Sequence, residues 1–241
     1  MTPLTPRRLA GSRFAPALGL ALALALLTTP FAISAGSTPE VRPDQSLPFF
    51  QEVQAFVSSD RTNPPPKRSI LFIGSSSIRL WSTLAQDFPK HRVINRGFGG
   101  SQIVDSIRYF DQIVTPYKPR LIVMYAGGND INAGRSAQGV FEDYQTFAGL
   151  VHKALPRTRV AYISIAPNPA RWAQVDRVRE ANRLIAEYSQ HDSKLKFIDV
   201  FPHMLGPDGT PKPDIYRDDR LHMNAKGYAL WQGLIRPYLD P

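Results

Sequence analysis

The sequence predicts an α/β fold in which helices cover both faces of a parallel β-sheet. From Ser69 onward, short unbroken apolar runs alternate with longer segments whose apolar residues recur at helical spacing. Strands that are apolar throughout are buried on both faces, which is typical of parallel sheets. The chain has 241 residues, of which 43% are hydrophobic, so one domain with a sizeable core is expected.

The predicted elements follow one another in a regular order. The first is a helix over residues 47–58, which Asn63 and a stiff proline run at residues 64–66 separate from the rest. Five apolar runs then predict strands, at residues 69–73, 92–95, 121–125, 159–165 and 195–200. Between and after them, amphipathic segments predict helices at residues 78–88, 103–114, 136–155, 173–190 and 225–238. Together they predict a flavodoxin-like three-layer α/β/α sandwich with a five-stranded parallel sheet.

The first 35 residues have the order of a secretory signal peptide. Three arginines and no acidic residue precede or border an apolar run at residues 15–27, and small residues follow at 32–35. The alternative is a membrane anchor, because residues 14–33 are uncharged and nearly long enough to span a bilayer. Pro30 and the small residues favour cleavage. We therefore predict an exported protein, periplasmic or secreted, with a signal peptide at residues 1–35 and no stable membrane insertion after cleavage.

The mature chain is then predicted to have two parts. Residues 36–66 form a tail, the N-terminal helix and a Pro-rich connector, and residues 67–241 form the main domain. Removal of residues 1–35 lowers the formal net charge from +9 but still leaves 26 basic against 20 acidic residues. The basic residues are scattered, without the aromatic-interleaved stripe of nucleic-acid-binding proteins, so no nucleic acid partner is expected. The absence of Cys excludes disulfides, thiolate metal sites and a cysteine nucleophile.

Four motifs fall in loops that follow the predicted strands. In sheets of this type, ligands bind at the edge where the carboxyl ends of the strands meet. Each motif alone is common, but the presence of all four at one edge, in this order, strongly indicates a functional site. They are GSSS at residues 74–77, NRGFGG at 95–100, AGGND at 126–130 and DRLH at 219–222.

These motifs resemble the blocks of the SGNH (GDSL-type) hydrolases, a family named for the Ser, Gly, Asn and His of its four blocks. The resemblance runs from about residue 69 to about residue 239 and is closest to single-domain bacterial members with a GSSSIRLW-type first block. It implies a hydrolase domain at residues 67–241 and an ester substrate. By motif, it places the nucleophile at Ser76, the oxyanion-hole donors at Ser76, Gly100 and Asn129, and the remaining catalytic residues at Asp219 and His222.

The chemistry of acyl transfer needs these residue types. A serine hydroxyl becomes a good nucleophile when a histidine takes its proton, and a carboxylate on the other ring nitrogen fixes the tautomer of that histidine. Asp219 and His222 are three residues apart, so one turn can present both side chains on one side. Backbone N–H groups and the Asn129 amide can stabilise the developing oxyanion, and a helix N-terminus at Ser76 favours negative charge.

Two positions depart from the usual family pattern. Ser75 stands where the family usually has Asp, which leaves three consecutive serines. We expect Ser76 to be the nucleophile and Ser77 to start and cap the helix that follows. Arg220 stands where Gly is common, so it could crowd the loop or attract an anionic ester.

Other titratable residues at this edge have simpler expected roles. His203 is the main competitor as the base, but no carboxylate lies three residues before it. Asp130 and Asp199 are expected to hold their loops through backbone hydrogen bonds. The aspartates near His222 have the loose spacing of a solvated loop, so neither a metal nor a cofactor is expected.

The leading hypothesis is an exported serine ester hydrolase that acts through an acyl-enzyme. Short connections predict an open, shallow site, which suits small-molecule or glycan-linked esters of short acyl groups, with a lysophospholipid as a further candidate. One alternative is a flavin- or phosphate-binding module, because a serine-rich loop after the first strand can hold a phosphate. The other is a non-catalytic glycan-binding protein. The paired Asp219 and His222, which neither alternative needs, favour the enzyme.

Overall fold

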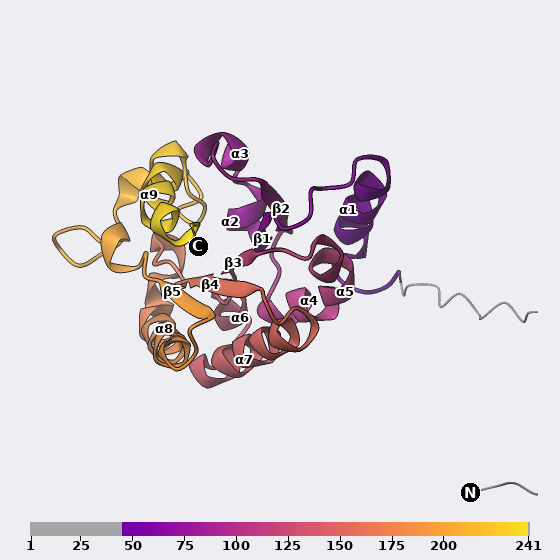
Figure 1. Cartoon of the computed structure of the whole chain (residues 1–241). Coiled ribbons are helices and arrows are strands. Elements are labelled where there is room, and N and C mark those ends of the chain that lie inside the picture. The colour runs from indigo at the N-terminus through magenta and orange to yellow at the C-terminus, as the bar shows by residue number, and fades with distance from the viewer. Residues whose placement is uncertain (1–44, 241) are drawn as a thin grey trace, which may run out of the picture. The chain divides into compact units, whose positions relative to one another are not determined.

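The computed structural model describes residues 45–240 of the protein (Figure 1). The predicted signal peptide at residues 1–35 therefore lies outside the described residues. One sheet of five parallel strands runs through the described part in the order β2-β1-β3-β4-β5. The strands are β1 (Ile70–Gly74), β2 (Val93–Gly97), β3 (Leu121–Tyr125), β4 (Arg159–Ile163) and β5 (Leu195–Ile198). This confirms the predicted flavodoxin-like three-layer fold with a five-stranded parallel sheet.

The register of the sheet brings the carboxyl ends of its central strands together. Gly74, the last residue of β1, is level with Gly97 of β2 and with Tyr125 of β3. β2 lies on one side of β1, whereas β3, β4 and β5 follow on the other side, so the strand order reverses between β1 and β3. Doubly wound sheets bind their ligands at such a position. The loops that follow β1, β2 and β3 therefore start side by side.

Helices cover the two faces of the sheet and enclose one apolar core on each (Figure 1). The core of one face includes residues of α1 (Phe50–Thr62), α4 (Ile103–Arg108), α5 (Phe110–Ile113), α7 (Ala137–Ala154) and α8 (Val175–Gln190). The core of the other face includes residues of α2 (Ser76–Arg79), α3 (Leu84–Asp87) and α9 (Ala225–Ile235). β1 and β3 are buried along their whole length, as their unbroken apolar runs predict.

Two segments that were each predicted as one continuous helix are each divided into two short helices. The segment 78–88 is divided into α2 and α3, because Trp81 between them turns into the core and packs against Phe72 and Trp231. Asp87 stabilises this break by accepting hydrogen bonds from the Trp81 indole at 2.5 Å and from the Thr83 hydroxyl at 2.7 Å.

The segment 103–114 is likewise divided into α4 and α5 at Tyr109. This ring is 2% exposed, and its hydroxyl donates to the carbonyl oxygen of Pro48 at 2.6 Å. The helix that precedes the proline run, predicted at 47–58, is present as α1 over Phe50–Thr62, and its Val53 is fully buried. The short helix α6 (Gly128–Asn132) was not predicted.

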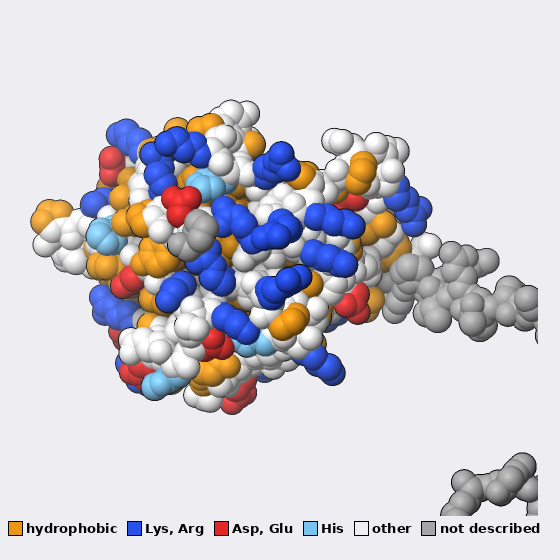
Figure 2. All heavy atoms as spheres, in the orientation of Figure 1, with side chains coloured by type: hydrophobic (Ala, Val, Ile, Leu, Met, Phe, Trp, Pro, Cys, Tyr) orange, Lys and Arg blue, Asp and Glu red, His pale blue; other side chains and the backbone are white. Residues whose placement is uncertain are grey.

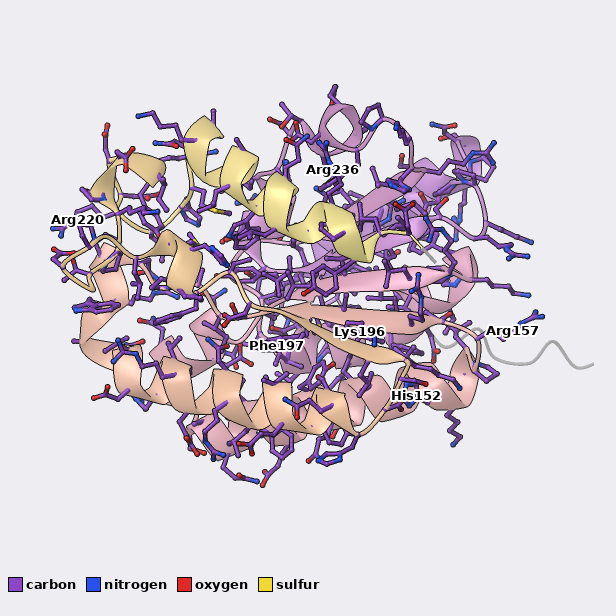
Figure 3. The ribbon with its side chains drawn as sticks, turned by 60° about the vertical axis from the view of Figure 1, so that its left-hand side comes forward. His152, Arg157, Lys196, Phe197, Arg220 and Arg236 are labelled. Atoms are coloured by element: carbon purple, nitrogen blue, oxygen red, sulfur yellow. The ribbon has the colours of Figure 1, made fainter. Side chains whose placement is uncertain are left out.

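The surface is strongly basic on one side (Figure 2). At the amino ends of the strands, five cationic side chains contribute to the wall of a hollow: Lys67, Arg68, Lys118, Arg120 and Arg157. Figure 3 shows Arg157 at this end of the sheet and Arg220 at the opposite end. No helix within residues 45–240 is long and apolar enough to cross a lipid bilayer.

Candidate active site

The loop after β1 presents Ser76 at the start of α2. Gly74 has a φ of +128°, and a Cβ atom there would come within 1.9 Å of the carbonyl oxygen of Tyr125, so only glycine fits. That carbonyl oxygen accepts a hydrogen bond from the Ser75 N–H at 2.9 Å. The chain therefore leaves β1 tightly against β3, and Ser76 follows as the first helical residue, half-buried at the sheet edge.

The prediction that Ser77 starts and caps this helix is wrong. Ser75 is the N-cap residue, with an extended backbone and no capping bond from its side chain, and the helix begins at Ser76. The Ser75 N–H bonds to the Tyr125 carbonyl oxygen directly after β1, and the helix begins at the next residue. The carbonyl oxygen of Ser77 accepts a hydrogen bond from the Tyr228 hydroxyl at 2.9 Å, which anchors α2 to α9.

The structure brings Ser76, His222 and Asp219 into one hydrogen-bonded chain. Ser76 Oγ lies 2.9 Å from His222 Nε2, and His222 Nδ1 lies 2.6 Å from Asp219 Oδ2. The other carboxylate oxygen of Asp219 accepts from the backbone N–H groups of Leu221 and His222, both at 2.9 Å. With Nδ1–H donating to Asp219, Nε2 is the free acceptor for the serine proton.

The environment of Asp219 keeps its carboxylate ionised. Partial desolvation raises the pKa, but the hydrogen bonds from the backbone and ring of His222 and from the Leu221 N–H outweigh it. The net result is a pKa of about 2. Asp219 is therefore negatively charged at neutral pH and can stabilise an imidazolium at His222.

The competing base predicted for this edge, His203, is not the histidine that bonds to Ser76. His203 is exposed in the single turn Pro202–Met204, and its carbonyl oxygen accepts a hydrogen bond from the Lys212 ammonium at 2.9 Å. Within the described residues, the histidine that bonds to Ser76 Oγ is His222. Asp199 accepts from the Phe201 N–H at 3.2 Å, which confirms its predicted loop-capping role.

The three predicted oxyanion donors line one hollow beside the nucleophile. Ser76, Gly100, Asn129 and His222 all belong to its wall. Gly100 has a φ of +76° and is exposed, and Ser76 offers the N–H of a first helical residue. The backbone N–H groups of Ser76 and Gly100 and the side-chain amide of Asn129 can each donate to a substrate oxygen in this hollow.

The amide of Asn129 is held from both ends. Its Nδ2 donates to the carbonyl oxygen of Ser101 at 3.0 Å, and its Oδ1 accepts from Arg171 Nη1 at 3.0 Å. A flipped amide would place like groups against each other at both contacts, so the orientation is determined. One Nδ2 hydrogen is used by Ser101, and the second remains for a ligand.

Asp130 supports the same loop from inside, as predicted. Its two carboxyl oxygens accept from the backbone N–H groups of Ile103 and Gly127, each at 3.0 Å. The side chain is fully buried, and desolvation raises its pKa to about 6 in spite of these hydrogen bonds. Asp130 thus joins the start of α4 to the start of α6, the helix that carries Asn129.

Arg171 is a site residue that the sequence reasoning missed. It lies in the loop after β4, where the Asn168 side chain accepts from the Arg171 N–H at 2.9 Å. Besides Asn129, Arg171 Nη1 donates to the carbonyl oxygen of Gly128 at 3.1 Å. Its position just past the end of a predicted strand, at the edge of the four motifs, was the available signal. The same loop meets the last motif, because the Ala170 N–H donates to the carbonyl oxygen of Arg220 at 3.1 Å.

Arg220 occupies a left-handed backbone conformation, with a φ of +56°. This explains why glycine suits the position, since a non-glycine residue there carries backbone strain. The side chain is exposed, at the end of the sheet that carries the site (Figure 3).

Two spaces open next to Ser76. A narrow cavity of about 30 Å³ lies between the catalytic residues and a wall that includes Trp231, Met204 and Tyr216. A wider, open hollow of about 520 Å³ contains the oxyanion donors. Arg171 borders both of them.

The sequence matches the family model of the GDSL-like lipase/acylhydrolase family over residues 74–230, which includes all four motifs. The chain belongs to this family. As a GDSL-like acylhydrolase it is a hydrolase of ester bonds, and this confirms the predicted enzyme over both non-enzymatic alternatives. Among curated protein sequences, none matches this acylhydrolase.

Solved structures share the fold of this acylhydrolase at low identity. A Streptococcus pneumoniae protein named for platelet activating factor has a TM-score of 0.71 and 21% identity, and the match covers 79% of this chain and 92% of that one. A GDSL-like lipase from Bacteroides thetaiotaomicron has a TM-score of 0.66 and 21% identity, with 78% and 96% covered. A carbohydrate esterase family 3 protein from Talaromyces cellulolyticus has a TM-score of 0.57 and 20% identity, with 70% and 95% covered.

Proposed function

We propose that this acylhydrolase is an exported serine esterase that removes short acyl groups from small-molecule or glycan esters through an acyl-enzyme on Ser76. The observation that carries the proposal is the hydrogen-bonded chain from Ser76 Oγ through His222 to Asp219. A serine held against a neutral imidazole whose other nitrogen donates to a carboxylate is an activated nucleophile.

The proposed reaction has two halves. Ser76 Oγ attacks the ester carbonyl carbon while its proton passes to His222 Nε2, and the carbonyl oxygen becomes an oxyanion near Asn129 and Gly100. The tetrahedral intermediate collapses, the alcohol leaves with the proton from Nε2, and the acyl group remains on Ser76. A water molecule then gives a proton to Nε2, attacks the acyl carbon, and releases the carboxylic acid while Ser76 recovers its proton.

The size of the inner cavity supports a short acyl group. At about 30 Å³ it has room for one water-sized group, which matches the methyl of an acetyl ester and not a long chain. The wide hollow leaves space for a larger alcohol part, including a sugar. The esterases among the structural neighbours include one named a carbohydrate esterase, which is consistent with a glycan ester.

Active-site labelling with a fluorophosphonate tests the nucleophile. Ser76→Ala should abolish both labelling and hydrolysis of p-nitrophenyl acetate, because Ala removes only the hydroxyl and is tolerated at the first residue of a helix. Ser75→Ala is the matched control, since it changes the neighbouring serine, whose bond to Tyr125 is made by the backbone N–H and is kept in the variant. Loss of labelling in Ser75→Ala, with labelling kept in Ser76→Ala, would move the nucleophile.

Two further measurements test substrate and export. A series of p-nitrophenyl esters should show kcat/KM highest for acetyl and falling with chain length, with acetylated glycans and a lysophospholipid run beside it.

The proposed removal of residues 1–35 predicts an exported chain whose intact mass corresponds to an N-terminus near Gly36. A chain that keeps Met1 and partitions with membranes would instead carry an uncleaved anchor.

A further inference from the structure

We propose that Arg171 binds an anionic group on the alcohol part of the substrate, so that the preferred substrates are short-chain acyl esters of alcohols bearing a carboxylate or phosphate. The inference rests on the proposed function, because it names the substrate class of the same site. It starts from an unneutralised cation beside the nucleophile.

The guanidinium of Arg171 has donors left over. Nη1 donates to the Gly128 carbonyl oxygen and to Asn129 Oδ1. Within residues 45–240, no hydrogen bond joins Nε or Nη2 of Arg171 to another residue. The side chain is nevertheless half-buried and borders both spaces next to Ser76. Nε and Nη2 form the edge of a guanidinium that matches the two oxygens of a carboxylate or phosphate.

Arg171 has no counterion within residues 45–240, unlike several arginines of that part. Arg96, Arg135 and Arg183 each contact a carboxylate within 4.0 Å. No carboxylate of the described residues lies that close to Arg171, and burial lowers the pKa of its guanidinium from the ordinary value. An arginine nevertheless stays charged at neutral pH. A partly desolvated charge without a partner costs free energy, which a bound anion would recover.

The other charges of the wide hollow leave Arg171 as its unbalanced cation. Arg79 lies 3.7 Å from the Glu52 carboxylate, so that pair is close to neutral. Glu52 is further occupied by the N–H of Gly99, which donates to it at 3.2 Å. Asp219 accepts three hydrogen bonds from the residues next to it. Among the charged groups of this hollow, the hydrogen-bond donors that remain free for an incoming anion are therefore those of Arg171.

The two spaces assign the anion to the alcohol part of the ester. The cavity of about 30 Å³ accepts no more than a small acyl group, which leaves no room there for a carboxylate on the acyl chain. The alcohol part has to occupy the open hollow, and Arg171 forms part of that wall. An acetylated acidic sugar has the required arrangement: a small acyl group and an anion on the alcohol side.

The test compares matched pairs of acetyl esters that differ in one charge. The first pair is an O-acetylated methyl glucuronoside and its carboxyl methyl ester, and the second is an O-acetylated sugar phosphate and the sugar without phosphate. The measured quantity is the ratio of kcat/KM for the anionic ester to that for its neutral partner. A charge-assisted bidentate contact predicts a ratio of about ten or more for one of the pairs, which also tells carboxylate from phosphate.

Arg171→Gln should reduce this ratio to about one, and Arg171→Lys should keep part of it. The ratio is used because the loss of Arg171 also loosens Asn129, which slows both esters of a pair alike. Arg79→Gln is the matched control: it removes a cation from the same hollow, but one that Glu52 already neutralises, so the ratio should change less than about twofold. Circular dichroism and the urea midpoint establish that each variant is folded.

A wild-type ratio at or below one for both pairs, or a preference that survives in Arg171→Gln, would overturn the inference. Failure of the proposed function has a different signature: no acetyl ester is cleaved, or cleavage continues in Ser76→Ala. If neutral acetyl esters are cleaved through Ser76 while the ratio is one, the esterase stands and the anion recognition is wrong.

Discussion

Asp219 and His222 contribute to the same hydrogen-bonded chain but do different work. His222 accepts the proton of Ser76, whereas Asp219 orients the ring and balances its charge. The side chain of Asp219 is 47% exposed, so water can partly replace its carboxylate when it is removed. His222→Ala should therefore lower kcat for p-nitrophenyl acetate by about 10²–10⁴-fold, and Asp219→Ala by a clearly smaller factor.

Steady-state kinetics of both variants, with Ser76→Ala as the baseline, checks this order. His203→Ala is the matched control, because it removes an exposed histidine from the same edge that does not contact Ser76. The assignment of the base would be wrong if His203→Ala were inactive and His222→Ala fully active.

Asp130 should make the stability of the fold depend on pH. Its pKa is raised to about 6, chiefly by burial and also by the charge of Asp143, whereas the same carboxyl in the unfolded chain titrates near 3.8. Between these values the folded state holds the proton more tightly. Stability from this group is complete below about pH 4 and is lost as the pH rises through 6, by about 3 kcal/mol at most.

Urea unfolding of the wild type and of Asp130→Asn, from about pH 4.5 to about pH 8, measures this effect. Asn lacks the titration but can accept from only one of the two N–H groups of Ile103 and Gly127, so it is less stable throughout. The gap in unfolding free energy between the two proteins should narrow as the pH rises. A gap that stays constant would show that Asp130 does not titrate in this range.

Some residues of the site could be predicted from the sequence and others could not. Ser76, Asp219 and His222 could be placed because each belongs to a motif, and the structure does bring them together. Arg171 belongs to none of the four motifs. Its importance depends on where its guanidinium lies relative to Asn129, which is a property of three loops packed together.

Among the elements, α1 is held on the domain by its buried Val53 and by a largely buried ion pair between Asp60 and Arg96. The carboxylate of Asp60 accepts from Arg96 of β2 and from the Tyr117 hydroxyl, the latter at 2.6 Å. Arg96 also donates to that hydroxyl at 2.6 Å and lies over the ring of Phe56. The side chains of Arg96 and Asp60 are only 12% and 19% exposed, so removal of one partner leaves the other charge desolvated.

Asp60→Ala should therefore destabilise the protein by about 3–5 kcal/mol, as for other broken buried pairs. Hydrogen exchange should become faster along Phe50–Thr62 than in α7, because α1 loses its anchor. Glu180→Ala is the matched control: its pair with Arg183 is as short as 2.7 Å but lies on the surface, and its removal should have little effect. Equal destabilisation by both changes would mean that burial of the Asp60 pair is unimportant.

The elements were predictable in type and order but not in their breaks. Apolar periodicity continues through Trp81 and Tyr109, so nothing in the pattern marks the ends of α2 and α4. The breaks arise because each large ring turns into a core that other segments complete, Trp231 for one and Phe98 for the other. Trp231 is distant from Trp81 in the sequence, and Phe98 lies outside the helical segment of Tyr109, so the local pattern contains neither partner.

For the whole molecule, the two cores differ in their relation to the site. Trp231 is fully buried in the core that includes α2 and α9, and it also forms part of the cavity wall beside Ser76. Phe147 is fully buried in the core on the other face and lines neither space next to Ser76. Truncation of either aromatic side chain to Ala should cost about 3–5 kcal/mol of stability.

Their effects on catalysis should nevertheless differ. Trp231→Ala enlarges the inner cavity, so in the folded enzyme it should raise the relative kcat/KM for butyryl over acetyl esters. Phe147→Ala should leave that preference unchanged. Urea unfolding and the chain-length series, both measured below the unfolding temperature of each variant, check the two expectations. A changed preference in Phe147→Ala would show that the two sides of the sheet are not independent.

The architecture as a whole was predictable because its signals are repeated along the chain. The unbroken apolar runs of β1 and β3 became strands buried along their whole length, and right-handed parallel connections leave few possible orders for five strands. What could not be predicted was the volume next to Ser76. That volume depends on Met204, Tyr216 and Trp231, which come from the loop after β5 and from α9 and meet only in the finished fold.

The hydrogen bond between Ser76 and His222 joins positions 146 apart, whereas Asp219 and His222 are three apart. In folding terms, these two contacts have very different loop-closure entropies, and the long closure also needs the sheet between its ends. The acid–base pair can thus form locally while the chain is still collapsing, but the nucleophile meets its base only when both ends of the domain have docked. Reactivity of Ser76 toward an acylating probe during refolding should therefore appear only when the final long-range contacts form. Such labelling would measure the fraction of chains that have folded completely.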